Sequence, residues 1–157
     1  MAKLKKTKVA FIASIVAVVL SAVTTLGIII GVKHNNQDTV EVKNSMYEIG
    51  LITETGKLAE SKHSAYLEDI SNIDGLVIDI DEDNATITYK VVFYDADEKF
   101  ISMTEDLTED YDVKNNPENA EFFRIMITPI EVDGEPVKLS IFNLSKYTKQ
   151  IDVSFNK

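Results

Sequence analysis

The feature that most constrains this chain is an apolar run of 24 residues from Val9 to Val32, which contains no charged residue and no Asn, Gln or Pro. As an α-helix, such a run extends about 36 Å at 1.5 Å per residue. That length exceeds the ~30 Å hydrocarbon core of a bilayer, and the run is apolar on every side. The sequence therefore predicts one transmembrane helix over residues 9–32.

Lysines are distributed unequally around this predicted helix, with four before it and one directly after it, which predicts a cytoplasmic N-terminus. The run is longer than the roughly 7–15 apolar residues of a cleavable signal, and no Ala-x-Ala triplet closes it. We therefore expect an uncleaved signal anchor in the cell membrane, with the remainder of the chain outside the cell. The predicted organisation is a basic cytoplasmic tail (1–8), a transmembrane anchor (9–32), a polar tether (33–45) and an external domain (46–157).

The part of the chain predicted to be external is strongly acidic. Residues 35–157 contain all 26 acidic residues and 11 of the 16 basic residues, which gives a net charge of −15. Such a surface repels nucleic-acid phosphates, so no nucleic-acid partner is expected. The chain has no cysteine, which excludes a disulfide framework and a thiolate metal site.

Beyond the tether, short segments rich in β-branched and aromatic residues alternate with turn-forming residues. Strands are expected at residues 47–53, 76–80, 85–94, 100–103, 121–127, 137–142 and 150–155, with residues 56–70 as a long irregular connection. No segment after Val32 has a sustained 3.6-residue apolar period. Strands at intervals of about ten residues predict a mainly β domain, an antiparallel β-sandwich.

Four of these regions, residues 47–52, 76–80, 91–102 and 120–127, also carry a family resemblance. The segment 91–102 is the most similar, as a strand–turn–strand unit. Together the four regions resemble a jelly-roll, carbohydrate-binding-module-like (galactose-binding-like) domain of phage tail and bacterial surface proteins. The resemblance spans about residues 47–130, and it implies a jelly-roll-like sandwich with a carbohydrate as ligand.

Groups that could perform catalysis are scarce in this sequence. Its two histidines, His34 and His63, are far apart, and neither has a metal-ligand spacing with another His or a Cys. No serine lies in the strand–turn–helix context of a nucleophile, and no glycine-rich loop could hold a phosphate. We therefore expect no enzymatic activity, no catalytic residues and no cofactor.

Closely spaced aspartates provide weak candidates for metal ligands, namely Asp79, Asp81, Asp83, Asp95 and Asp97. The first three have the initial spacing of a calcium-binding loop, but the sixth position is Asn84 instead of Gly and the twelfth is Lys90 instead of Glu. A turn is therefore favoured over a metal site at both places. The densest acidic run, residues 105–112, favours a solvated loop that could attract basic or divalent partners.

The function that we expect is a membrane-anchored, extracellular binding or adhesion module, whose ligand is a glycan or a cell-envelope polymer. A bound sugar needs an exposed aromatic ring beside polar acceptors. Five tyrosines are available for this role, although those in strands are mostly expected in the core: Tyr66, Tyr89, Tyr94, Tyr111 and Tyr147. The sequence assigns no ligand-binding residues and no protein partner.

The alternative function is that of a structural or assembly subunit of an envelope or pilus-like machine. Pilins resemble this layout of a basic leader, an apolar helix and a β-rich head, but the acidic residue that pilins place near the start of the helix is absent here. An aromatic-lined groove on the domain would favour binding. A flat, apolar, uncharged patch would favour assembly.

Overall fold

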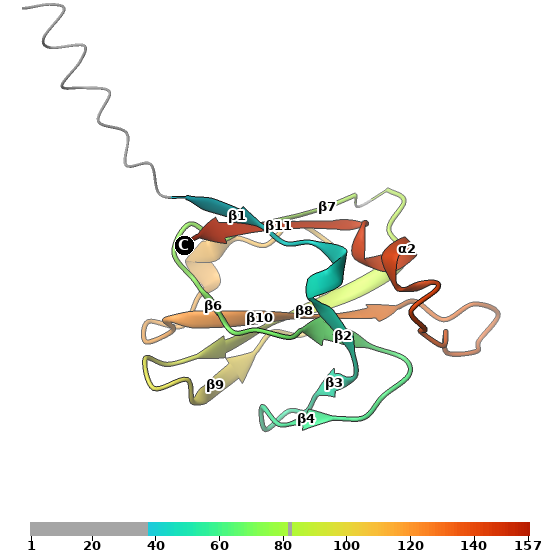
Figure 1. The fold of residues 1–157 in the computed structure, drawn as a ribbon, viewed down its shortest axis with the longest axis horizontal. Coiled ribbons are helices and arrows are strands. Elements are labelled where there is room, and N and C mark those ends of the chain that lie inside the picture. The colour runs from blue at the N-terminus through green and yellow to red at the C-terminus, as the bar shows by residue number, and fades with distance from the viewer. Residues whose placement is uncertain (1–37, 82) are drawn as a thin grey trace, which may run out of the picture. The chain divides into compact units, whose positions relative to one another are not determined.

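The computed structural model describes residues 38–81 and 83–157 (Figure 1). The chain divides into two compact units, Met1–Gln37 and Asp38–Lys157, and only the second lies in the described range. The predicted cytoplasmic tail and transmembrane anchor, together with the first part of the tether, lie outside the described residues. Within the described residues, no helix combines the length and the apolar character needed to cross a bilayer.

The described unit, here called the head, is mainly β-structure. Its strands are β1 (Thr39–Glu41), β2 (Tyr47–Ile49), β3 (Leu51–Ile52), β4 (Leu58–Ala59), β5 (Ala65–Leu67), β6 (Ser71–Asn72), β7 (Val77–Ile80), β8 (Ile87–Tyr94), β9 (Phe100–Met103), β10 (Phe122–Pro129) and β11 (Ile151–Asn156). Its short helices are η1 (Asn44–Met46), η2 (Val113–Asn115) and α2 (Leu144–Thr148).

The strands of the head form antiparallel sheets. The larger sheet has the order β2-β5-β10-β8-β9, with β6 also paired to β10, and the smaller sheet has the order β1-β11-β7. Strands β3 and β4 form a separate hairpin. The longest ladder joins β8 to β10 and places Phe93 opposite Phe123.

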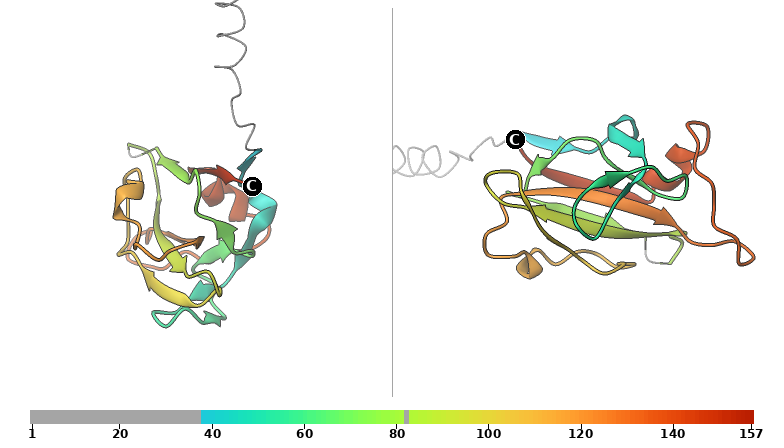
Figure 2. Two further views of the ribbon diagram at one scale, coloured as in Figure 1. Left: turned by 90° about the vertical axis from the view of Figure 1, so that its left-hand side faces the viewer. Right: turned by 90° about the horizontal axis from the view of Figure 1, so that it is seen from below.

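The larger and smaller sheets enclose one apolar core in a sandwich-like arrangement, which the two views of Figure 2 show from the side and from below. Alternate residues of β8 and β10 are fully buried there, among them Val91 and Ile125. The rings of Phe123 in β10 and Phe155 in β11 meet edge to face, 5.5 Å apart, and so connect the two sheets directly. Burial of these side chains is the main force holding the sheets together.

A second, smaller apolar cluster covers the outer face of the larger sheet. There the β3–β4 hairpin packs Ile52 against Tyr66, Val92 and Met126. The second half of β8, residues 91–94, is therefore buried on both faces, which explains why its sequence is apolar without interruption there. Gly50 lies between β2 and β3, and a Cβ atom there would lie 2.8 Å from the Tyr66 ring, so the chain bends where only glycine fits.

The structure confirms that the domain is mainly β and antiparallel, and it reproduces several predicted strands closely. Residues 76–80, 85–94 and 100–103 correspond to β7, β8 and β9, and residues 150–155 correspond to β11. The predicted strand 47–53 is divided at Gly50 into β2 and β3, which pair in different sheets.

The first of two differences from the sequence-based expectation lies at the N-terminal edge of the head. Residues 39–41, inside the predicted tether, form β1 and pair with β11, because Val40 lies opposite Phe155 and packs on the core. The compact unit that contains the head begins at Asp38.

The second difference is at residues 137–142, which form no strand, so the predicted strand there is wrong. Only one of the apolar residues of that segment, Leu139, is fully buried. Its backbone nitrogen donates to the Lys62 carbonyl, 2.6 Å away, and the chain then turns outward into α2.

Candidate functional site

The two ends of the head differ in what they carry. At one end the first and last strands meet, and the Lys157 nitrogen donates to the Asp38 carbonyl at 3.0 Å. At the opposite end, here called the distal end, lie residues 83–86, which precede β8, and residues 130–150, which connect β10 to β11 (Figure 2, right). Loops at one end of a sandwich are a common place for binding residues.

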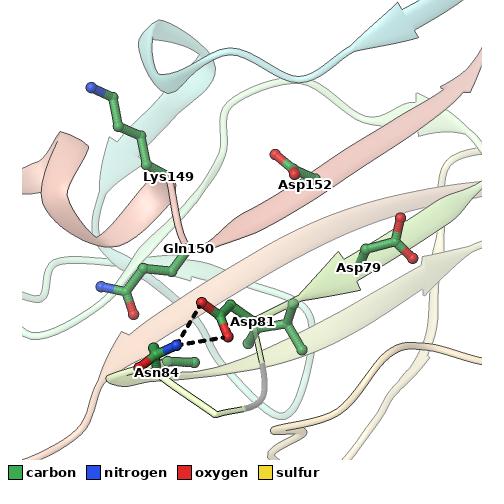
Figure 3. A pocket seen from close by; sticks show the side chains of 8 residues that line it. Asp79, Asp81, Asn84, Lys149, Gln150 and Asp152 are labelled. Atoms are coloured by element: carbon green, nitrogen blue, oxygen red, sulfur yellow. Dashed lines mark hydrogen bonds between the residues drawn. The ribbon is translucent and has the colours of Figure 1, made fainter.

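A polar hollow of about 380 Å³ lies at the distal end (Figure 3). Its polar side chains come from the end of β7, the following turn and the start of β11: Asp79, Asp81, Asn84, Lys149, Gln150 and Asp152. The Gln150 side chain connects the turn before β8 to α2. Its Oε1 accepts from the Thr86 nitrogen at 2.6 Å, and its Nε2 donates to the Lys146 carbonyl at 2.9 Å. The hollow is therefore built from a fixed backbone framework.

The acidic groups of this hollow are only partly satisfied by the protein. Asn84 donates through Nδ2 to both carboxylate oxygens of Asp81, at 3.1 and 3.2 Å. Asp79 and Asp152 are exposed and lie opposite each other on β7 and β11. The Lys149 side chain extends away from both, and in the described structure no ion pair joins it to either carboxylate.

The five candidate metal ligands do not converge. Asp79 and Asp81 lie at the hollow and Asp83 is exposed in the turn beyond it, whereas Asp95 and Asp97 lie in the β8–β9 turn. Among residues 38–81 and 83–157, no three His, Asp or Glu side chains are grouped so that they could hold a metal ion.

The β8–β9 turn uses its aspartates to hold its own backbone. Asp95 Oδ1 accepts from the nitrogens of Asp97 and Lys99, at 2.9 Å in both cases. Asp97 pairs with the Lys99 ammonium at 2.9 Å on the surface. These contacts are those of a hairpin turn.

The acidic run 105–112 has similar structural contacts. Asp110 accepts from the Ile80 nitrogen at 2.8 Å and so caps the free edge of β7. Asp106 accepts from the Thr88 hydroxyl, and Asp112 accepts from the Lys114 nitrogen at the start of η2. This run packs along the sandwich, so its acidic groups are partly engaged by the head itself.

The tyrosines do not form an exposed aromatic surface. The rings of Tyr66, Tyr89, Tyr94 and Tyr147 are buried, and Tyr111 is half-buried. Burial is the main cause that raises the pKa of the buried Tyr89 above its usual range, and burial followed by the Asp112 carboxylate raises the pKa of Tyr111 to about 12. Their hydroxyl groups therefore remain neutral at physiological pH.

The only arginine of the chain, Arg124, lies on the outer face of the larger sheet. Its guanidinium carbon lies 6.0 Å from the Tyr66 ring centroid and 5.8 Å from that of Tyr94, and Nη2 donates to the Glu68 carbonyl at 2.7 Å. Its Nε atom is buried without a partner among the described residues. Arg124 thus connects β10 to the segment that follows β5, and its buried Nε atom is not accessible to a ligand.

An apolar pair stands out on the distal end. Ile141 is 81% exposed and Phe142 is 90% exposed, the highest values among the large apolar residues of the described chain. Phe142 is also the only exposed aromatic ring among these residues, because the others are half-buried or buried. We call this pair the apolar tip.

The turn that carries the apolar tip is held in place by one side chain. Asn143 Oδ1 accepts from the backbone nitrogen of Ser140 at 2.7 Å and from its hydroxyl at 3.2 Å, and Nδ2 donates to the Lys138 carbonyl at 2.9 Å. At the base of the turn, His63 Nδ1 lies 2.9 Å from the Val137 carbonyl. A carbonyl oxygen only accepts, so Nδ1 carries the proton. The tip is therefore presented on a fixed backbone.

The sequence indicates only part of this distal end. Its closely spaced aspartates include Asp79 and Asp81 but not Asp152, which lies far along the chain on β11 and meets Asp79 only through β-pairing. The apolar tip was not predicted, because residues 137–142 alternate as a strand does. The available signal was Asn143, a residue type that commonly bonds to its own turn.

Comparisons with protein-family models, with curated proteins and with solved structures find no match to this chain.

Proposed function

We propose that this chain is a membrane-anchored, extracellular binding module that engages its ligand through the distal end of the head. The anchor in this proposal is the apolar run of residues 9–32, and the excess of lysines before it directs the head to the outside. The finer assignment of the head as a jelly-roll-like sandwich belongs to the same proposal. It draws support from two antiparallel sheets around one core.

One observation carries the proposal, namely the apolar tip on its fixed turn. Single exposed apolar side chains are common on proteins. Two adjacent ones, exposed at 81% and 90% and held by the bonds of Asn143, present apolar area to the solvent without a partner in the head. Rigid presentation lowers the entropy lost on binding, which is a property of binding loops.

The same geometry favours binding over the alternative role in assembly. The tip projects from a turn whose neighbours Lys138 and Lys146 are exposed and charged, instead of forming a flat, uncharged patch. For a glycan ligand, Phe142 is the ring that supports stacking, because the tyrosines are buried or half-buried. The proposal includes no enzymatic activity and no cofactor.

The experiment uses the full-length protein in phosphatidylcholine vesicles, incubated with envelope fragments of the source cells that contain both wall and membrane. Sedimentation measures the fraction of vesicles that bind to the fragments. We expect binding by the wild type, a loss of at least about tenfold in the double variant I141S/F142S, and unchanged binding by L58S. Leu58 is a matched control because it is 49% exposed on the remote β3–β4 hairpin.

Circular dichroism of all three proteins establishes whether the substitutions leave the fold intact. Equal binding by the wild type and I141S/F142S would show that the apolar tip is not the contact. Absence of binding by the wild type would contradict the proposal as a whole.

A further inference from the structure

The charges of the segment that carries the apolar tip differ from those of the rest of the head. Residues 136–151 contain three lysines and no acidic residue, although residues 35–157 have a net charge of −15. All three lysines, Lys138, Lys146 and Lys149, are exposed. A basic apolar surface on an otherwise acidic protein is complementary to a surface that is both anionic and apolar.

We propose that the apolar tip and these three lysines dock onto an anionic phospholipid bilayer. The inference rests on the proposed binding role of the tip, and it names the partner. In this contact Ile141 and Phe142 enter the boundary between headgroups and acyl chains, and the ammonium groups remain at the phosphates. Lysines near an anionic membrane each raise the affinity about fivefold.

The structure fixes the depth of this contact. Leu139 is buried in the head and its nitrogen is bonded to the Lys62 carbonyl, so the backbone before the tip cannot extend. After the tip, Tyr147 is buried and anchors α2, with the Lys146 ammonium 5.2 Å from its ring centroid. Only the two side chains of the tip are free to enter the membrane, so insertion is shallow.

The neighbouring turn limits the area of the contact. Glu131, Asp133 and Glu135 are exposed on the same connection and would be repelled by anionic headgroups. Asp133 and Gly134 form a tight turn with positive φ angles, which is closed by the bridge between Val132 and Glu135. The bilayer therefore meets the turn of residues 138–143 and α2, and not the entire distal end.

The test uses the absence of tryptophan from the chain. Because Phe142 is 90% exposed, F142W introduces the single tryptophan of the chain at the tip without a clash in the head, and it can be excited selectively over the six tyrosines. The matched control is V132W, since Val132 is 61% exposed on the same connection but lies between acidic residues. Both variants are made in the full chain and reconstituted in vesicles of phosphatidylcholine alone or of phosphatidylglycerol and phosphatidylcholine. Flotation removes protein that has not been incorporated, so that only the emission of vesicle-anchored protein is measured.

We expect the emission of F142W to shift to the blue, and to be quenched by brominated lipid, in the vesicles that contain phosphatidylglycerol but not in phosphatidylcholine alone. The emission of V132W should be the same in both. The shift should disappear in the background K138Q/K146Q/K149Q. It should also disappear at 1 M salt, where the Debye length falls to about 3 Å.

Two outcomes would overturn the inference. If F142W has the same emission in both kinds of vesicle without a shift, the tip does not contact the bilayer. If it shifts equally in both, the lysines do not select anionic lipid. Binding to envelope fragments that depends on the tip, without any response to phosphatidylglycerol, would leave the proposed function intact and would identify a wall component as the partner instead.

Discussion

Asp79 on β7 and Asp152 on β11 lie directly opposite each other in the smaller sheet, and both carboxylates face the solvent. Opposite residues of an antiparallel pair have Cβ atoms about 5 Å apart, so two like charges in these positions repel each other. No ion pair with either carboxylate is formed in the described structure. The repulsion between these two carboxylates therefore destabilises the smaller sheet, and the burial of the apolar side chains on its inner face outweighs it.

The first prediction follows from this repulsion. Substitution of Asp152 by Asn should raise the free energy of unfolding by about 0.2–1 kcal/mol, because it removes one charge of the pair and keeps the shape. The gain should shrink as salt screens the pair. Urea unfolding at low and high salt measures both effects.

Asp97→Asn serves as the control for this measurement. Asp97 has the Lys99 ammonium 2.9 Å away in an exposed pair, so its neutralisation should change stability little or lower it slightly. A loss of stability in D152N, or a gain that does not depend on salt, would contradict the explanation by charge repulsion.

The second prediction concerns two core tyrosines with opposite hydrogen-bonding states. The Tyr47 hydroxyl is buried without a partner among the described residues, whereas the Tyr89 hydroxyl donates to the Glu109 carbonyl at 2.6 Å. A buried polar group without a partner costs about 1–3 kcal/mol, and a satisfied one contributes about 1 kcal/mol. Tyr47→Phe should therefore stabilise the head by about 1 kcal/mol, and Tyr89→Phe should destabilise it by a similar amount.

Thermal unfolding followed by circular dichroism compares the two variants directly. Because both substitutions remove one hydroxyl from a buried ring, a general effect of the missing oxygen would move both melting temperatures in the same direction. That result would refute the assignment of the two hydroxyls.

Strands were predictable where their own residues, without distant partners, have the composition and pattern of a strand. Residues 87–94 are β-branched or aromatic at every position except Lys90, which suffices to predict a strand. The turn between β8 and β9 was likewise predictable from the aspartates at 95 and 97, because Asp commonly bonds to the backbone two residues further on.

Other elements could not be predicted because distant residues decide them. Residues 39–41 are a strand only since β11, more than 100 residues later, provides a partner and a core for Val40. Residues 137–142 have the alternation of a strand but meet no partner strand, and local bonds to Asn143 turn them outward instead. The candidate site could not be predicted for the same reason. Asp79 and Asp152 lie opposite each other only because β7 pairs with β11 in the folded sheet.

The third prediction is a loss of stability at alkaline pH. The pKa of Tyr111 is raised to about 12 by burial and then by the Asp112 carboxylate, against about 10 in the unfolded chain. Between these values the folded state keeps a proton that the unfolded state has lost, so the free energy of unfolding falls as the pH rises from 10 to 12. The contribution of Tyr111 is fully present below pH 10.

Urea unfolding at a series of pH values, together with tyrosinate absorbance, measures this dependence. In Tyr111→Phe the slope of stability against pH should be shallower above pH 10. The overall stability should also be lower, because the hydrogen bond to Asn116 Oδ1 at 2.9 Å is lost. An unchanged slope would show that Tyr111 does not retain its proton in the folded state.

The last prediction separates a strand at residues 39–41 from a tether. A fragment of residues 38–157 should fold alone with a β-type circular dichroism spectrum, whereas a fragment of residues 43–157 should be less stable by about 2 kcal/mol. The shorter fragment loses the β1–β11 pairing, the bond from the Val42 nitrogen to the Val153 carbonyl at 2.8 Å, and the packing of Val40. Each lost hydrogen bond costs about 1 kcal/mol net, and the ordering entropy that the shorter chain no longer loses offsets part of the total.

In the full-length protein, Val42→Pro removes the same backbone donor and should lower the melting temperature, whereas Thr39→Ala, at an exposed position, should not. Equal melting temperatures for the two fragments would mean that residues 39–41 behave as a tether.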